Sequence, residues 1–446
     1  MKKIKQRLSN ISNFVDDEYR PLLANFLSLG IIQGSNFLLS IITFPYVVRV
    51  IGVESFGLIT LLQTIMLYFV VLTDYGFNLT ATKEVSVHRN DVDRLSKIFS
   101  EVMVTKAVLL VLSFILFASA LLLIPNFEDY QLIALLSFSI VVGQLLQPQW
   151  LFQGVEQMKY MTYINITIRA LYAIGIFTFI SQAQDYLYIN LINGISLIIG
   201  GVISLIIVFK KFNLKFTIPG INQIIQQLKD SWSIFFSTIS VSIANNTNIV
   251  ILGLFASPLV IGYYSIAEKV FQIMRTFAVI LYQVVYPRIC MLAERSFSEL
   301  AIFLKLIFKA ILLTFLPLSV LVFILSDYIV YLVAGEYLSE ASLVLRIICF
   351  GPLMAALNIP PAQTMLAYRL TKSFTIIVSI GAAVNVGLNF ILAYYFKATG
   401  TAFSILATET LITILLYITL YRNFPEYCFF HKDVAAKKIP QADLIK

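Results

Sequence analysis

Eight charged side chains fall inside long apolar segments of this sequence, where each charge is costly. Five are cations and three are acids: Lys106, Arg169, Lys269, Arg275, Arg346, Asp74, Glu268 and Glu409. A buried cation can bind an anion, and a buried carboxyl can take up a proton. Groups of this kind favour binding and ion transfer over covalent catalysis.

The apolar segment 262–287 carries the densest group of these charges. Glu268, Gln272 and Arg275 are spaced by 4 and 3 residues, so a helix places them on one face. With Lys269 beside them, one acid stands against two cations. Because guanidinium binds phosphate oxygens in bidentate fashion, we predict that Arg275 and Lys269 bind a diphosphate. A Glu268–Arg275 pair that only locks helix packing is the alternative.

The other intramembrane cations lie nearer the ends of their segments. Arg169 is about two turns inside the segment 161–180, and Arg346 about one turn from the outer end of its segment. Both are further candidates for a cation in a central cavity. Lys106 lies about one turn inside its segment, so its long side chain can snorkel to the interface.

The three acids are candidates for coupling transport to an ion. Glu268, Asp74 or Glu409 could carry H⁺ or Na⁺, because a carboxyl inside a membrane is poised between its charged and neutral forms. Structural pairing with a cation is the alternative for each of them.

Amide side chains supply a second kind of candidate site. Asn245 and Asn248 lie in the middle of an apolar segment, and Gln33 and Asn36 lie at a similar depth in another. Such amides suit the hydroxyl groups of a sugar. Hydrogen bonding between helices is the alternative.

Metal, nucleotide and catalytic motifs are not found. The three cysteines form no C-x-x-C pair, and the two histidines are far apart. There is no Walker loop, H-E-x-x-H or G-x-G-x-x-G sequence. We therefore expect no metal, no cofactor and no enzymatic activity.

The elements that position these residues must be membrane-spanning helices. The chain has 446 residues, of which 59% are hydrophobic and 13% charged, against about 25% charged in soluble domains. A span needs about 20 apolar residues, and twelve segments meet that need. They are 22–48, 55–78, 102–124, 131–153, 161–180, 187–209, 231–255, 262–287, 306–326, 342–366, 374–396 and 401–421.

The positive charges orient these spans. Of the Lys and Arg residues outside the spans, only Arg49 and Lys397 fall on one side, so the opposite side, with both termini, is cytoplasmic. The formal net charge of +8 is thus mainly a matter of topology and does not indicate nucleic acid as a partner. The loops predicted on the outer side are short, so they leave no room for the outer domain of an integral-membrane transferase.

The twelve spans divide into two halves around a polar segment with a Pro219-Gly220 turn. Its isoleucines and leucine suit an amphipathic helix along the cytoplasmic surface. The predicted regions are a tail 1–21, an N-lobe 22–209, a linker 210–230, a C-lobe 231–421 and a tail 422–446. Two halves of six helices are the usual plan of alternating-access transporters.

Three stretches carry a resemblance to a known family. They are P-Y-V-V-R-V-I-G-V-E-S-F-G (Pro45–Gly57), P-Q-W-L-F-Q-G-V-E-Q-M-K-Y (Pro148–Tyr160) and N-I-T-I-R (Asn165–Arg169). With the twelve spans, they resemble the Wzx-type polysaccharide flippases of the multidrug/oligosaccharidyl-lipid/polysaccharide exporter superfamily.

That resemblance implies two six-helix lobes around a central cavity in the bacterial inner membrane. It implies an undecaprenyl-diphosphate-linked oligosaccharide, an O-antigen or capsule repeat unit, as cargo moved from the cytoplasmic to the periplasmic leaflet. A polysaccharide polymerase and a chain-length regulator are implied as partners. A cation- or proton-coupled drug exporter of the same superfamily is the alternative, although its first span usually holds an acid that 22–48 lacks.

Overall fold

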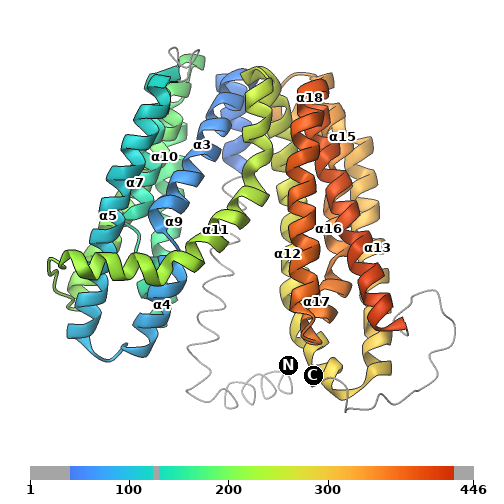
Figure 1. The fold of residues 1–446 in the computed structure, drawn as a ribbon. Coiled ribbons are helices and arrows are strands. Elements are labelled where there is room, and N and C mark those ends of the chain that lie inside the picture. The colour runs from blue at the N-terminus through green and yellow to red at the C-terminus, as the bar shows by residue number, and fades with distance from the viewer. Residues whose placement is uncertain (1–40, 124–129, 426–446) are drawn as a thin grey trace, which may run out of the picture. The chain divides into compact units, whose positions relative to one another are not determined.

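The computed structural model describes residues 41–123 and 130–425, and the regular structure in these ranges is helical, without a strand (Figure 1). This confirms the predicted all-α class. A helix satisfies its own backbone polar groups, as a segment in lipid must. The chain divides into two compact units, Met1–Asn246 and Thr247–Lys446.

The first unit begins, in its described part, with the short apolar helix Ile41–Ile51. The helices that follow are α3 (Val53–Asp74), α4 (Phe77–Val87), α5 (Val92–Leu123), α6 (Gln131–Ser137), α7 (Ser139–Leu145), α8 (Gln149–Gly154), α9 (Met158–Phe179), the 3-10 turn η2 (Ala183–Asp185) and α10 (Tyr186–Lys211). Helix α11 (Ile221–Phe255) is bent and passes from this unit into the second.

The second unit contains the remaining helices. They are α12 (Pro258–Arg295), α13 (Phe297–Ile324), α14 (Ser326–Ala334), α15 (Ser339–Ile348), α16 (Gly351–Leu357), α17 (Ile359–Ala367) and α18 (Thr371–Asn423).

Helix α18 contains two spans joined by a sharp turn. Its backbone leaves the helical region at Lys397, where φ is 52° and ψ is −129°. The two halves run antiparallel, because Asn385 donates a hydrogen bond to Thr408 and Gly381 faces Ile412. The Nζ of Lys397 donates to the carbonyl of Phe255 at 2.9 Å, which ties this turn to the end of α11.

The number of described helices is consistent with twelve spans. Nine helices in the described ranges are long and apolar enough to cross a membrane, and α11 makes a tenth when its bent parts count as one. α18 counts once among them but holds the predicted spans 374–396 and 401–421. Most of the first predicted span, 22–48, lies outside the described residues.

Several predicted spans are broken where the sequence disfavours a continuous helix. α3 ends at Tyr75 and Gly76, which both have positive φ. Pro148 separates α7 from α8, and α16 ends just ahead of Pro360. Proline lacks the N–H that would continue the hydrogen-bond ladder, so each break leaves backbone polar groups for other partners.

Glycines allow α7 and α10 to pack closely. A Cβ at Gly194 would overlap Ser139, and one at Gly143 or Gly201 would overlap Leu197 or Leu146. Small residues of this kind let backbones approach in membrane helices, where there is little hydrophobic force between spans.

The segment between α10 and α11 is attached to the first unit. The amides of Lys215 and Thr217 donate to the hydroxyls of Ser96 and Ser100 on α5, both at 2.9 Å. The predicted linker helix then starts at Ile221 and continues as one helix into the first part of the predicted seventh span, before α11 bends between Ile243 and Asn246. The division between the units falls within that span, after Asn246.

Candidate functional site

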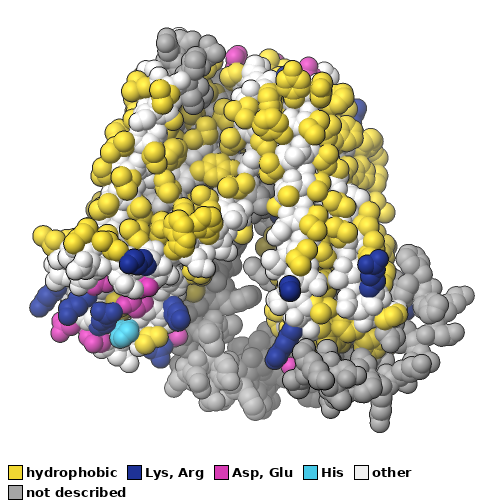
Figure 2. Space-filling model, in the orientation of Figure 1, with side chains coloured by type: hydrophobic (Ala, Val, Ile, Leu, Met, Phe, Trp, Pro, Cys, Tyr) yellow, Lys and Arg dark blue, Asp and Glu magenta, His cyan; other side chains and the backbone are white. Residues whose placement is uncertain are grey.

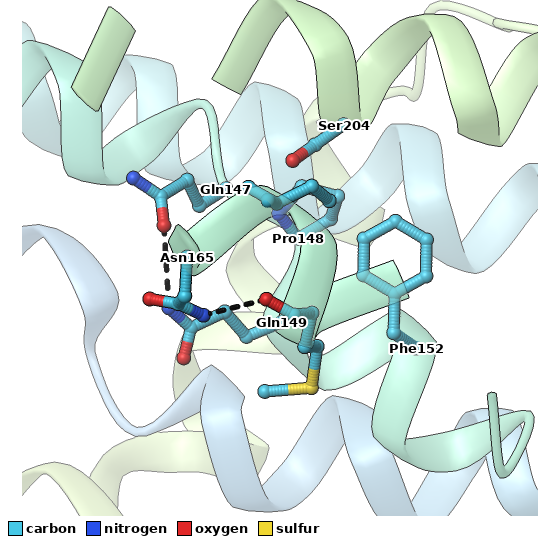
Figure 3. Close-up of a pocket in the computed structure, with 8 residues that line it drawn as sticks. Gln147, Pro148, Gln149, Phe152, Asn165 and Ser204 are labelled. Carbon is cyan, nitrogen blue, oxygen red and sulfur yellow. Dashed lines mark hydrogen bonds between the residues drawn. The ribbon is translucent and has the colours of Figure 1, made fainter. Parts of the chain in front are cut away.

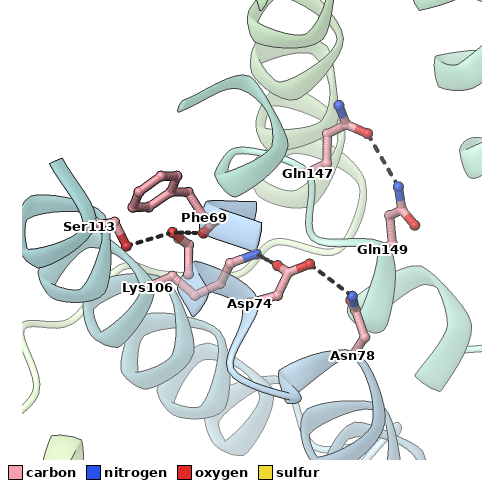
Figure 4. Close-up of polar contacts among 8 residues, drawn as sticks. Phe69, Asp74, Asn78, Lys106, Ser113, Gln147 and Gln149 are labelled. Atoms are coloured by element: carbon pink, nitrogen blue, oxygen red, sulfur yellow. Dashed lines mark hydrogen bonds and ion pairs between the residues drawn. The ribbon is translucent and has the colours of Figure 1, made fainter. Parts of the chain in front are cut away.

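An ion pair lies between α3 and α5 in the first unit. Lys106 Nζ is 2.6 Å from Asp74 Oδ1, and their side chains are only 1% and 16% exposed (Figure 4). Asn78 donates to the other carboxylate oxygen at 3.1 Å. Each charge is therefore compensated by a direct partner, as burial requires.

The prediction that Lys106 snorkels to the interface is wrong. Its ammonium group pairs with Asp74 instead, because the end of α3 brings a carboxylate within reach of α5. Asp74 stays a candidate for ion coupling, now with Lys106 as a fixed counter-charge.

A small, partly open cavity lies at the α7–α8 break, lined by both amide and apolar side chains (Figure 3). Its volume, about 10 Å³, is close to the room that one water molecule needs. Gln149 donates to Gln147 Oε1 at 3.3 Å, and Asn165 donates to the Met161 carbonyl at 2.8 Å. Gln147 Nε2 is buried without a hydrogen-bond partner among the described residues. The cavity joins two of the stretches that carry the family resemblance.

Four of the predicted charges in the second unit are linked by electrostatic interactions. Arg275 on α12 interacts electrostatically with Glu268 on the same helix and with Glu409 on α18. Glu268 also interacts with the adjacent Lys269. We call Glu268, Lys269, Arg275 and Glu409 the Arg275 cluster.

Glu409 changes the charge balance that the sequence of α12 alone predicts. With Glu409 included, the cluster holds two acids and two cations. The surplus of one positive charge that the sequence of α12 predicts is offset, in formal charge, by Glu409, which comes from a helix distant in sequence. An anion can still bind Arg275, provided that it displaces a carboxylate or that a carboxylate takes up a proton.

The carboxylate of Glu409 is positioned by a helix break. Asn358, which ends α16, donates to Glu409 Oε2 at 3.3 Å and accepts from the hydroxyl of Thr413 at 2.7 Å. Thr413 lies one turn beyond Glu409 on α18 and donates also to its carbonyl, at 2.8 Å. This network links α16 and α18 at the acid.

The candidate amide Asn248 lies in a contact between helices. Asn389 on α18 donates to Asn248 Oδ1 at 3.0 Å, and both side chains are buried. Hydrogen bonding between helices, the alternative raised for this residue, is what the structure shows. The side chain of Asn245 lies outside the described part, as do Gln33 and Asn36.

The remaining predicted cations lie apart from the Arg275 cluster or in the other unit. Arg346 donates to Asp327 at 2.6 Å and to the hydroxyl of Ser326 at 2.8 Å, so its charge is balanced at the start of α14. Arg169 lies half-buried on α9 in the first unit, next to Tyr172.

Comparison with known proteins agrees with this architecture. Residues 22–293, more than half of the chain, match the model of a family described as polysaccharide biosynthesis protein. A candidate O-antigen transporter of Escherichia coli (strain K12) is 30% identical over 90% of this chain and 97% of its own length. The chain belongs to the polysaccharide biosynthesis protein family.

A second family relative has similar coverage. A candidate O-antigen transporter of Shigella dysenteriae is 26% identical over 88% of this chain and 98% of its own length.

Solved structures show the same fold at low identity. The lipid II flippase MurJ in an inward closed conformation is 15% identical over 90% of each chain, with a TM-score of 0.67. An inward-facing multidrug resistance transporter of the MATE family and the MOP superfamily is 12% identical, over 90% of this chain and 98% of its own, with a TM-score of 0.64. This family member is therefore a multi-pass membrane protein with the fold of these transporters.

Sequence reasoning missed the amides that hold the polar groups of the second unit. Asn358 precedes I-P-P, and Asn385 and Asn389 are spaced one turn apart in an apolar span. A lone amide beside a proline break, or two amides four residues apart, is a signal that could have found them. No group of His, Cys, Asp and Glu in residues 41–123 and 130–425 is arranged to hold a metal ion.

Proposed function

We propose that this protein is a flippase that moves an undecaprenyl-diphosphate-linked oligosaccharide repeat unit from the cytoplasmic to the periplasmic leaflet. The observation that carries the proposal is Arg275, a half-buried guanidinium that interacts electrostatically with two carboxyl groups in an apolar helical unit. Two full-length relatives named as candidate O-antigen transporters support it, as does the fold shared with a lipid II flippase.

In this proposal the diphosphate binds by competition. Its oxygens form charge-assisted hydrogen bonds to Arg275 and displace Glu268 or Glu409 from that cation. The prenyl chain stays in lipid, and no covalent bond forms or breaks. The two lobes then alternate between openings to the two sides of the membrane.

The same competition provides ion coupling. When the cargo takes Arg275, the displaced carboxylate loses its counter-charge in an apolar setting, and uptake of H⁺ or Na⁺ restores neutrality. Glu409 is the favoured carrier, because Asn358, which itself accepts from Thr413, donates to its carboxylate at a helix break. Glu268 and Asp74 remain further candidates.

A drug or small-molecule exporter is the second candidate function. The observation that favours it is the pair of acids in the Arg275 cluster, which would attract a cationic cargo in place of an anionic one. Such an exporter would not need Arg275 for surface polysaccharide.

Arg275→Ala is the variant that tests the proposed function. We expect the protein to reach the membrane at normal amounts while surface polysaccharide falls about tenfold or more, because a charge-assisted hydrogen bond to the cargo is lost. Arg275→Lys should retain part of the activity. Arg288→Ala, on the same helix but at an exposed position, is the matched control.

Surface polysaccharide from a chromosomal Arg275→Ala strain, compared by gel electrophoresis with the wild type, is the measurement. Normal polysaccharide in that strain would contradict the role of Arg275 and would favour the exporter.

The location follows from the proposed pathway. We place the protein in the bacterial inner membrane with both termini in the cytoplasm, and we expect a polysaccharide polymerase and a chain-length regulator to act with it. The distribution of Lys and Arg supports this orientation. A periplasm-dependent reporter fused after Arg422 should be inactive.

A further inference from the structure

The first part of α11, Ile221–Ile243, has one face that packs on the first unit. Gln227 donates to Glu101 of α5 at 3.1 Å, and the hydroxyls of Ser231 and Thr80 are 2.8 Å apart. Phe235 is buried and stacks on Tyr75, with ring centroids 4.5 Å apart. This face holds α11 across α4 and α5, as Figure 1 shows.

A second face of the same helix is apolar and exposed. Ile221, Ile225, Trp232 and Phe236 are 66%, 44%, 54% and 52% exposed. Their spacing of 4, 7 and 4 residues places them in one narrow stripe, which we call the apolar stripe. Figure 2 shows hydrophobic side chains gathered over α11 and charged side chains below it.

The third face is polar. Asn222, Gln223, Gln226, Asp230 and Ser233 are exposed on it. A helix with one protein face, one apolar face and one polar face matches a membrane–water interface, where protein, acyl chains and water meet along one line.

The helix also lies at the level where the lipid-facing surface of α5 ends. From Val108 onward α5 exposes apolar side chains, including Val111 and Leu112. Its earlier part, around Glu101, is buried where α11 crosses it. The apolar stripe therefore continues the lipid-facing surface of α5 onto α11.

Exposed lysines surround this helix. Lys210 and Lys211 end α10, Lys215 precedes α11, and Lys229 lies on α11 beside the apolar stripe. Lysines near an anionic leaflet are attracted by its negative surface potential. Trp232 is the kind of side chain that is enriched at this depth of a bilayer.

We propose that residues 221–236 of α11, which carry the apolar stripe, form an interfacial helix that binds anionic lipid headgroups, while the rest of α11 belongs to the seventh span. The apolar stripe enters the boundary between headgroups and acyl chains, and Lys210, Lys211, Lys215 and Lys229 contact the lipid phosphates. This surface is separate from the Arg275 cluster and does not depend on the cargo.

Depth-dependent quenching of Trp232 tests the position of the helix. The chain has two tryptophans, and the other, Trp150, is 0% exposed. In proteoliposomes of the full chain, a nitroxide near the headgroup end of the acyl chain should quench Trp232 more strongly than one near the methyl end. The signal of Trp232 is the difference between the wild type and Trp232→Phe, which leaves Trp150 intact.

Two results would overturn the proposed depth. Quenching by aqueous acrylamide without quenching by lipid nitroxides would place the stripe in water. Stronger quenching by the deep nitroxide would place it in the bilayer centre.

Lipid composition tests the headgroup contacts. Shallow quenching of Trp232 should be stronger in vesicles with phosphatidylglycerol than in pure phosphatidylcholine. Replacing Lys210, Lys211, Lys215 and Lys229 by Gln should remove that difference. Lys309→Gln with Lys372→Gln, two lysines of the second unit, is the control. Equal quenching in the two lipids with the wild type would overturn the binding of anionic lipid.

Discussion

At the scale of single residues, charged side chains inside the predicted spans form ion pairs or hydrogen bonds with other side chains of the protein. Lys106 pairs with Asp74, Arg346 with Asp327, and Glu409 accepts from Asn358. In an apolar setting a missing partner costs far more than a present one contributes. We therefore expect the stability of the protein to fall when one member of such a pair is removed, and to fall less when both members are removed.

The Asp74–Lys106 pair allows a test of this asymmetry. Asp74→Leu or Lys106→Met alone should destabilise the protein by about 3–5 kcal/mol, because each leaves an uncompensated buried charge. The double variant should recover most of that loss. Thermal unfolding of the purified protein in detergent is the measurement.

An Asp74→Leu variant as stable as the wild type would contradict the closed pair. Transport by the double variant would, in addition, exclude Asp74 as the ion carrier, because neither charge remains.

At the scale of helices, close packing and helix breaks define the units. α7 and α10 pack closely at Gly143, Gly194 and Gly201. Pro148 and Pro360 each interrupt a predicted span at a place where polar side chains gather. The break at Pro360 places Asn358 against Glu409. Breaks and glycines therefore decide where polar groups meet.

Gly194→Ala should weaken the packing of α7 on α10. The added Cβ overlaps Ser139, and overpacking of this kind costs about 1–3 kcal/mol. Gly387→Ala is the matched control, since a Cβ there meets nothing within 4 Å and alanine favours a helix. The measurement is the melting temperature of both variants in detergent. Equal melting temperatures for the two variants would show that the α7–α10 contact is not tight.

At the scale of the whole molecule, charge is distributed in two ways. Most cations lie outside the spans and set the predicted orientation, whereas the Arg275 cluster combines two acids and two cations within the second unit. Such a cluster can exchange one anionic partner of Arg275 for another. This is the physical basis on which cargo and ion binding can depend on each other.

Glu409→Gln should uncouple transport from the ion gradient. Glutamine keeps the hydrogen-bonding shape but cannot bind and release a proton or hold Na⁺, so cargo movement in membrane vesicles should no longer respond to a pH or Na⁺ gradient. Glu294→Gln, at an exposed position of α12, is the control. An unchanged response in Glu409→Gln would assign coupling to another acid, with Glu268 next to be tested.

Much of this protein could be predicted from the sequence by itself. The helical membrane class, the approximate spans and the charged candidates follow from it, because hydropathy and span length are properties of contiguous residues. Only the tertiary structure decided which charges meet. Lys106 reaches Asp74, and Arg275 acquires Glu409 as a second acid, because partners on different helices depend on helix rotation and on breaks such as that at Asn358. Rotation and breaks arise from packing between helices, which no single segment encodes.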